Sequence, residues 1–401
     1  MEAEGNAQLF RTCGLGRWAM RNRIVMSALT RCRADDDHVP TADMVKYYSD
    51  RASMGLIISE SIMVQRGYSA MAYEPGIYGP EQIAGWRKVT DAVHAKGGLI
   101  AAQIYHGGRA TVPCNLTTVG LVPVGASAVP IPAAAETCMA VWCRDGVSQP
   151  FAQEIHALSS AEIWSMVETF AIAARNCVSA GFDSVELHAG TGFLIDQFLR
   201  TSSNKRTDEY GGSIENRARF LLAVVDAVTA AIGPDRVGVR LTPLDSFNGQ
   251  SDEDPEGLLR YVSAELDGRG IAFIDLFRGD PKAAAVARSD IWVRECFRGT
   301  LLASHGYADA AAASRAIAEG AVDAVCFGLP AVANADLVWR LWSGTPLNRA
   351  DVTTLFTRGA EGYTDYPICE PKGFLQPSER GSATSSAAPT GQPALEKKSR
   401  L

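Results

Sequence analysis

Short apolar runs rich in β-branched residues alternate with longer amphipathic stretches along the 401-residue chain. Eight of the short runs are predicted to be strands. They are 23–29, 55–61, 99–105, 183–189, 236–241, 272–277, 300–304 and 322–328. Three of the longer stretches have apolar residues at helical spacing and end in glycine, as helices often do; they are 162–181, 215–233 and 308–320. The pattern predicts strands and helices in alternation.

Eight predicted strands that alternate with helices favour a fold of the α/β class, a (β/α)8 TIM barrel over residues 1–375. A doubly wound sheet is the alternative. The stretch 107–159 is rich in Pro, Thr and small residues and is too long for an ordinary connection. We expect it to form a lid over the barrel mouth. The end of the chain, 376–401, has Ser, Pro, Ala and charged residues without periodicity, which predicts a disordered tail.

Composition narrows the classes of partner. The net charge of −7 provides no basic surface for nucleic acid, and no apolar run reaches the roughly 20 residues needed to span a bilayer. The first residues lack a basic segment followed by an apolar one, so we expect a cytoplasmic protein without membrane contact. The nine cysteines contain no C-x-x-C spacing, which favours free thiols over a metal site.

In a TIM barrel the side chains at the carboxyl ends of the strands form the site. Polar residues stand at or just beyond several predicted strand ends. Taken singly, each is typical of a structural hydrogen-bonding residue. They are Thr30, Gln103, Tyr105, His106, His188, Thr191 and Arg240, with the turns at His305 and Gly328.

Taken together, these positions belong to longer motifs. The motifs are NRIVMSALTR (22–31), YYSDRA (47–52), AAQIYHGGR (101–109), GFDSVELHAGTGFLIDQFLRTSSNKRTDEYGGSIENRARF (181–220), VGVRLTP (237–243) and AEGYTDYP (360–367). In this order, from about residue 7 to residue 370, the sequence resembles the Old Yellow Enzyme family. The 181–220 block is a highly specific signature.

The resemblance implies a TIM barrel that binds FMN at its mouth. In the family, NAD(P)H reduces the flavin, which passes hydride to the β-carbon of a conjugated carbonyl while an acid protonates the α-carbon. By this resemblance, Thr30 and Gln103 hydrogen-bond the polar edge of the flavin ring. Arg240 places positive charge near the ring. All three residues are retained.

The chain departs from the family at the substrate pocket. The family motif H-G-A-N-G-Y corresponds to residues 188–193, so the carbonyl-binding His is His188 and its Asn partner is replaced by Thr191. The family's proton-donating Tyr corresponds to Phe193, which has no ionisable group. An aromatic pair common in the family corresponds to Leu355 and Phe356, again without a phenol. The resemblance therefore predicts an unusually apolar pocket.

A second departure affects the flavin phosphate. The family's F-G-R-P reads F-G-L-P here, so Leu329 after Gly328 replaces an Arg whose contact is worth about 1.5–3 kcal/mol. In the glycine-rich turn after the seventh strand, His305 precedes Gly306, and its side chain would intrude on the phosphate. A protonated His305 that replaces the lost Arg is the alternative. We expect FMN binding to be weak or lost.

These departures favour a redox-neutral isomerase or epimerase of a small hydrophobic carbonyl-containing secondary metabolite. His188 would stabilise the oxyanion of an enolate, and Asp245 and Tyr105 are candidates for the base. An FMN-dependent, NAD(P)H-using ene-reductase of conjugated carbonyl compounds is the alternative, and a noncatalytic ligand-binding barrel is the third possibility. The sequence leaves the oligomeric state open.

Overall fold

A computed structural model describes residues 4–117, 119–133, 135, 141–142, 148–149, 151–279, 286–307, 309–371 and 374. The predicted tail, 376–401, lies outside the described residues, as do parts of the predicted lid at 107–159. For these parts the expectations remain predictions.

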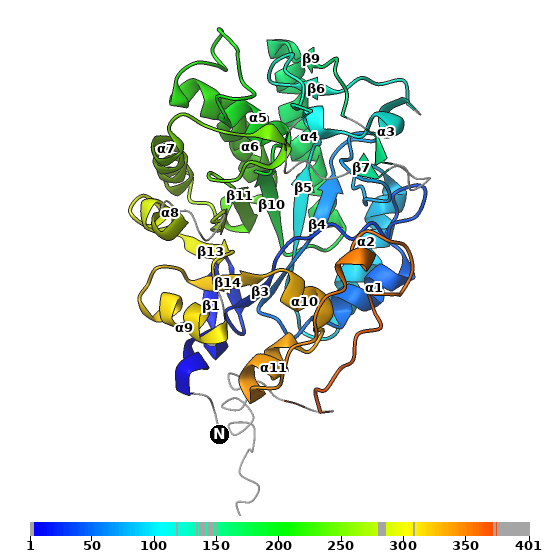
Figure 1. Cartoon of the computed structure of the whole chain (residues 1–401), viewed down its shortest axis with the longest axis vertical. Helices are drawn as coiled ribbons and strands as arrows, with labels where there is room; N and C mark the ends of the chain where they lie inside the picture. The colour runs from blue at the N-terminus through cyan, green and yellow to red at the C-terminus, as the bar shows by residue number, and fades with distance from the viewer. Residues whose placement is uncertain are drawn as a thin grey trace, which may run out of the picture.

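Eight parallel strands close into a barrel (Figure 1). In chain order they are β3 (Ile24–Met26), β4 (Leu56–Met63), β5 (Ile100–Tyr105), β10 (Ser184–Ala189), β11 (Val237–Leu241), β12 (Phe273–Phe277), β13 (Thr300–Ser304) and β14 (Ala324–Phe327). Each strand pairs with the next, and β14 pairs with β3 to close the ring. All eight predicted strands are present, so the TIM barrel is confirmed and the doubly wound sheet is excluded.

Helices connect the strands on the outside of the barrel. The longer ones are α1 (Ala42–Ser49), α2 (Pro80–His94), α4 (Ser160–Ser179), α6 (Ile214–Ile232), α7 (Pro255–Gly268), α8 (Val286–Arg294) and α9 (Ala310–Ala318). Helices α4, α6 and α9 fulfil the three helical predictions. A reciprocal pair of bonds between Ser159 and Glu162 caps the start of α4. Short helices α5 (Leu194–Leu199), α10 (Leu329–Ala333) and α11 (Leu337–Ser343) follow β10 and β14.

Smaller elements cover the two ends of the barrel. Before the barrel lie η1 (Glu4–Phe10) and a hairpin of β1 (Cys13–Leu15) and β2 (Trp18–Met20). The 107–159 insertion contributes η2 (Gly108–Ala110), α3 (Pro113–Thr117), β6 (Val124–Gly125), β7 (Val141–Trp142), β8 (Ser148–Gln149) and β9 (His156–Ala157). Elements α3, β6, β7 and β9 gather at the upper end of the view in Figure 1, beyond β4 and β5. Short helices η3 (Pro234–Arg236), η4 (Phe247–Gly249) and η5 (Val352–Thr354) complete the connections.

A distant segment of the chain returns to the residues that follow β3. Arg31 donates through Nη2 to the Gly362 carbonyl (2.8 Å), and Arg33 donates through Nη1 to the Leu355 carbonyl (2.8 Å). Tyr363 stacks on Tyr47 with ring centroids 4.0 Å apart. Buried arginine fixes backbone carbonyls strongly because each bond is charge-assisted. The segment 352–363 is therefore held beside the carboxyl end of β3.

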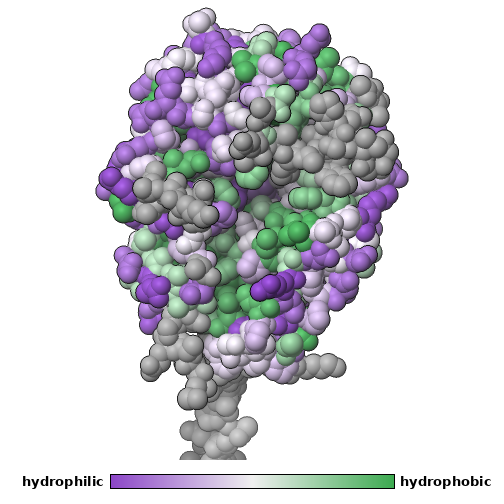
Figure 2. All heavy atoms as spheres, in the orientation of Figure 1, coloured by the Kyte–Doolittle hydropathy of each residue, from purple (hydrophilic) through white to green (hydrophobic). Residues whose placement is uncertain are grey.

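Apolar side chains fill the barrel below the site. Phe273 on β12 lies opposite Gly238 on β11, and it packs with interior residues of several other strands. Those residues include Val25, Leu56, Ile58, Ala101, Leu302 and Ala324. On the face shown in Figure 2, hydrophobic residues gather toward the centre and hydrophilic ones toward the margins.

We predict that Gly238→Ala destabilises the barrel by about 1–3 kcal/mol, because a Cβ on Gly238 would lie 2.2 Å from the Phe273 ring. Gly268→Ala at the end of α7 is the control, since a Cβ there would meet nothing within 4 Å. That change should leave stability the same or raise it by up to about 1 kcal/mol. Urea unfolding measures both, and equal midpoints for the two variants would contradict the packing argument.

Candidate active site

A line of polar side chains crosses the barrel interior at the carboxyl ends of three neighbouring strands. In the strand register, Gln103 on β5 lies opposite Glu186 on β10, and His188 on β10 lies opposite Arg240 on β11. Gln103 donates through Nε2 to Glu186 Oε1 (2.7 Å) and accepts at Oε1 from the Ser61 hydroxyl (2.8 Å). The structure thus brings together three predicted site residues, Gln103, His188 and Arg240.

Arg240 forms an ion pair with Asp275 of β12, which lies opposite it in the sheet. Both side chains are buried, so the pair is poorly screened by solvent. Asp275 was not among the predicted site residues. It stands in the predicted strand 272–277, and its alternation with the outward residues of that strand is the signal that places it inside.

His188 is buried with 5% of its surface exposed. Burial, reinforced by the positive charge of Arg240, holds the pKa of His188 well below its ordinary value, so the imidazole is neutral at physiological pH. Its Nδ1 has no hydrogen-bond partner among the residues that the structure describes. A neutral imidazole carries one N–H and can donate it to a carbonyl oxygen.

Glu186 is fully buried beside this line, and its Oε2 has no partner within the described part of the chain. Burial raises the pKa of Glu186, and the charge of Asp275 adds to the effect. The carboxyl group therefore keeps its proton at neutral pH. The sequence interpretation missed Glu186, although it lies two residues before His188 on one strand and so faces the same side.

An apolar wall adjoins His188. The Phe193 ring contacts the rings of His188 and Tyr105 edge-on, with centroids 4.9 and 4.7 Å apart. Phe356 packs against the same cluster, whereas the half-buried Leu355 lies in the adjacent turn and accepts from Arg31 at its carbonyl. The cluster also contains Cys32, Met63, Ala70, Met71 and, from the insertion, Ala110 and Ile131. Apolar side chains therefore surround Phe193, and its role in a substrate pocket stays a prediction.

Thr30 is half-buried and donates through Oγ1 to Glu74 Oε1 (3.2 Å). Oε2 of Glu74 accepts from the Met71 N–H (2.9 Å) and from the Tyr105 hydroxyl. Burial raises the pKa of Glu74 to about 7. Burial also raises the pKa of Tyr105 well above its usual value, so its phenol keeps its proton. Glu74 was not predicted from the sequence, since it lies in the connection between β4 and α2.

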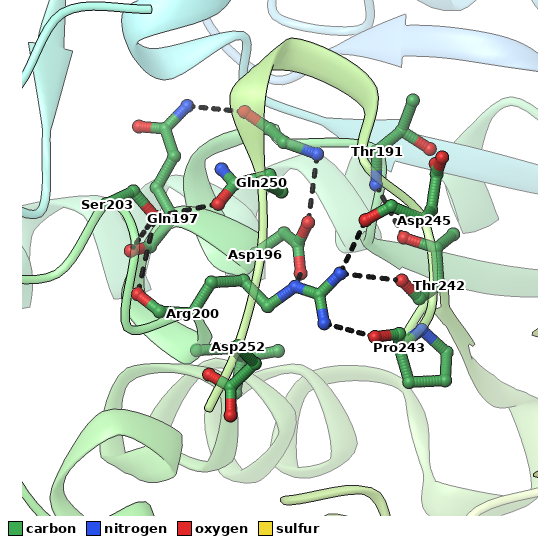
Figure 3. Close-up of polar contacts among 12 residues, drawn as sticks. Thr191, Asp196, Gln197, Arg200, Ser203, Thr242, Pro243, Asp245, Gln250 and Asp252 are labelled. Carbon is green, nitrogen blue, oxygen red and sulfur yellow. Dashed lines mark hydrogen bonds and ion pairs between the residues drawn. The ribbon is translucent and has the colours of Figure 1, made fainter. Parts of the chain in front are cut away.

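Thr191 and Asp245 lie in two turns that Arg200 holds in place (Figure 3). Arg200 donates through Nη2 to the carbonyls of Thr242 (3.1 Å) and Asp245 (2.8 Å) and forms an ion pair with Asp196 (3.3 Å). Asp196 in turn accepts from the Gly192 N–H (2.9 Å), and Thr191 donates from its backbone to Thr242 Oγ1 (2.8 Å). These contacts of Arg200 and Asp196 hold the turn after β10 against the turn after β11.

Asp245 itself is half-buried, and its Oδ2 lacks a hydrogen-bond partner in the described ranges. Burial raises the pKa of Asp245 to about 6. Thr191 has φ 58°, a left-handed conformation that its turn imposes. Among the described residues, the Asp245 carboxylate forms no hydrogen bond or ion pair with His188, Arg240 or Gln103.

The turns after β13 and β14 lie side by side, because Ser304 and Cys326 pair in the sheet. His305 has φ 69°, a conformation that favours glycine, and its Nδ1 donates to the Gly279 carbonyl (2.7 Å). Its ring packs near Phe277 with centroids 4.8 Å apart, so the imidazole is engaged by the chain itself.

The backbone of these turns fits a phosphate. The N–H groups of Gly306 and Gly328 donate to no other residue of the described chain. A Cβ on Gly328 would meet nothing within 4 Å, and Leu329 is 41% exposed. Free backbone donors next to open space are what an anion requires. The neighbouring position that the resemblance assigns to a cation is occupied by the uncharged Leu329.

The described residues contain neither a metal-binding cluster nor a helix that could span a membrane. No group of three or more His, Cys, Asp or Glu side chains is arranged there to hold a metal ion. None of the helices in that part of the chain is both long enough and apolar enough to cross a membrane.

A family model described as the NADH:flavin oxidoreductase / NADH oxidase family matches residues 8–348. The chain belongs to this family. A probable flavin mononucleotide-dependent alkene reductase of Leishmania infantum is 54% identical over 354 residues, which cover 88% of this chain and 95% of that protein. The chanoclavine-I aldehyde reductase fgaOx3 of Penicillium roqueforti is 38% identical over 370 residues, covering 90% and 96%.

Among solved structures, the old yellow enzyme from Trypanosoma cruzi superposes with a TM-score of 0.86 at 38% identity, covering 91% of this chain and 100% of that chain. The resemblance to the Old Yellow Enzyme family is therefore confirmed, and so is the expectation of an FMN-binding family. The relatives support the reductase alternative better than the isomerase interpretation. Weak or lost FMN binding stays a prediction.

We predict that Leu329→Arg tightens FMN binding about tenfold to a hundredfold, because a charge-assisted contact worth about 1.5–3 kcal/mol is restored. Leu329→Gln is the matched control, with a polar side chain of similar exposure but no charge, and should change affinity little. Fluorescence titration with FMN measures both. Equal affinity of the arginine variant and the parent would show that no phosphate lies near position 329.

The raised pKa of Glu186 gives a prediction on stability. Its contribution is fully present below the unfolded value of about 4.5 and is lost as pH rises toward the higher folded value, because the unfolded chain releases the proton first. As pH rises from 5 to 8, the free energy of unfolding should therefore decrease less in Glu186→Gln than in the parent.

Glu215→Gln in the first turn of α6, which is exposed, is the control for this measurement. A hydrogen bond with Ser213 lowers the pKa of Glu215, so its ionisation changes little between pH 5 and 8 in either state. Urea unfolding at several pH values should show the parental slope for this variant. A parental slope for Glu186→Gln as well would contradict a buried protonated carboxyl group.

Proposed function

We propose that this protein is an FMN-dependent, NAD(P)H-using ene-reductase of small hydrophobic conjugated carbonyl compounds. The observation that carries the proposal is the neutral, buried His188 imidazole, whose ring adjoins an apolar wall. Such a site suits an apolar substrate with one carbonyl oxygen. The alkene and aldehyde reductases among its relatives support the same substrate class.

The residues present fit FMN in part. Thr30, Gln103 and Arg240 would hold its ring, and the free N–H groups of Gly306 and Gly328 would hold its phosphate. When bound, FMN would take hydride from NAD(P)H and supply it to the substrate. The uncharged Leu329 weakens this binding without removing the backbone donors.

The chain's own contribution is to stabilise charge and to exclude water. As the β-carbon of the substrate gains hydride, negative charge builds on the carbonyl oxygen. His188 donates its N–H to that oxygen, and the positive field of Arg240 lies next to it in the sheet. The wall of Phe193, Tyr105 and Phe356 keeps the oxygen away from bulk water and so strengthens the bond.

We also propose that the insertion 107–159 covers this wall. Arg109 ties the insertion to the turn after β11, since it donates through Nη1 to the Val129 carbonyl (3.1 Å) and through Nη2 to the Asn248 carbonyl (3.0 Å). Ile131 packs in the cluster with Phe193 and Tyr105. These contacts support a role in closing the pocket.

A redox-neutral isomerase or epimerase is the second candidate. The absence of an ionisable group at Phe193 favours it, because reduction needs an acid for the α-carbon. Asp245, with an oxygen unpaired within the described ranges and a pKa of about 6, would then serve as the base.

The test is a product assay with purified protein, FMN and an apolar enone. We expect one NAD(P)H to be consumed for each product, which gains two hydrogens. His188→Ala should lower kcat/KM about a hundredfold to a thousandfold, because an oxyanion donor is lost. Phe193→Tyr, which leaves that donor in place, should have a much smaller effect.

Product that forms without NAD(P)H, with the mass of the substrate and with solvent deuterium at the carbon next to the carbonyl, would establish the isomerase and overturn the reductase proposal.

A further inference from the structure

Glu74 is a buried titratable group that contacts residues of both halves of the proposed site. Its Oε1 contacts the Thr30 hydroxyl at 3.2 Å, and its Oε2 accepts from the Tyr105 hydroxyl. Tyr105 packs edge-on against Phe193, which packs against His188. One carboxyl group thus lies between the residue assigned to the cofactor ring and the wall of the substrate pocket.

The two carboxyl oxygens differ in their surroundings. Oε2 has two hydrogen-bond donors, the Met71 N–H and the Tyr105 hydroxyl, and is suited to carry negative charge. Among the described residues, Oε1 has Thr30 as its one hydrogen-bond partner. Hydroxyl groups both donate and accept, so Thr30 can receive a proton from Oε1 and hand one on. Thr30 is half-buried whereas Glu74 is 1% exposed. A proton that leaves Glu74 Oε1 for the pocket therefore passes through the Thr30 hydroxyl.

We infer that Glu74 supplies, through the Thr30 hydroxyl, the proton that the substrate α-carbon needs and that Phe193 cannot give. This inference rests on the proposed reductase function. Tyr105 acts as a positioning residue, because its hydroxyl is held between Glu74 and the Ala70 N–H (2.9 Å) and does not face the pocket freely.

The step balances in atoms and charge. After the β-carbon has gained hydride, the former double-bond electrons lie on the enolate, with its oxygen on His188. The α-carbon then takes a proton from Thr30 Oγ1 and forms its new C–H bond. Thr30 takes the proton of Glu74 Oε1, which leaves a carboxylate stabilised at Oε2. Water restores the proton through Thr30 once the product has left.

The protonation of Glu74 suits this role. Its pKa of about 7 means that the acid form is present below neutral pH and is lost above it. Burial is the main cause, and hydrogen bonds from Tyr105 and Met71 oppose it. The titratable groups around it come from several elements: Glu60 on β4, Tyr105 on β5, Cys32 after β3, and His38, whose Nδ1 donates to the Glu74 carbonyl. The charges of Arg31 and Arg33 act on Cys32 and lie one step further away.

The experiment separates the two half-reactions of the FMN-loaded protein by stopped flow. In Glu74→Gln, we expect reoxidation by an enone to slow about a hundredfold more than reduction by NAD(P)H does. The parent's reoxidation rate should fall above about pH 7, and this fall should be absent in the variant. In Tyr105→Phe it should move to higher pH, because a bond that stabilises the carboxylate is lost.

A rescue distinguishes proton supply from a structural role. Phe193→Tyr in the Glu74→Gln background should restore most of the lost rate, since it returns a phenol to the pocket wall, and the rate should stay flat through pH 7. Glu81→Gln in the first turn of α2, which is exposed, is the matched control and should keep the parental rates and pH profile. Infrared difference spectra of parent minus Glu74→Gln should show a carboxylic acid band that titrates near pH 7 without any substrate.

Two results would overturn the inference while the reductase function stands: reoxidation in Glu74→Gln at the parental rate and pH profile, or an infrared difference with no protonated carboxyl group at pH 6. A parent protein that oxidises no NAD(P)H with any enone would instead overturn the proposed function and this inference together.

Discussion

The buried ion pair between Arg240 and Asp275 acts together with burial to set the charge states of its neighbours His188 and Glu186. Two opposite charges inside a barrel are stable only when they are paired, and their fields reach neighbouring groups with little screening. The guanidinium helps to keep His188 uncharged, while the carboxylate helps to keep Glu186 protonated. The barrel therefore presents neutral hydrogen-bonding groups around one fixed pair of charges. A neutral donor is what a developing oxyanion needs.

The barrel was predictable because its strands are buried on both faces. All eight residues of β4 are buried, and such strands appear in a sequence as largely apolar runs, here Leu56–Ile58 and Ile62–Met63 on either side of the polar Ser59–Ser61. Elements outside the barrel lack this signal. The pairs β1–β2 and β6–β9 have strands of three and two residues, which are too short to show a period, and the insertion has no apolar run that distinguishes its strands from its loops.

Site residues on the strands could be predicted from the sequence. Site residues in the connections could not, because the fold brings these segments together from distant parts of the chain. His188, Arg240 and Gln103 follow from strand parity, and the same rule would have found Glu186 and Asp275. Glu74 follows from no periodicity, because its neighbours Thr30 and Tyr105 are distant in sequence. The raised pKa of Glu74 depends on burial, which only the assembled structure supplies. The engagement of His305 by Gly279 was likewise invisible in the sequence.

Arg31 and Arg33 hold the carbonyls of residues 354–362, so one side of the pocket is built from both ends of the barrel chain. A ribosome makes Arg31 long before it makes Phe356. During synthesis the eight strands can therefore close while the mouth still lacks its Phe356 side and the two arginines lack their carbonyl partners. Such a chain has a folded barrel but an incomplete pocket. A competent site is in this sense a property of the nearly finished polypeptide, and premature termination after residue 350 would yield a barrel whose buried arginines have lost these partners.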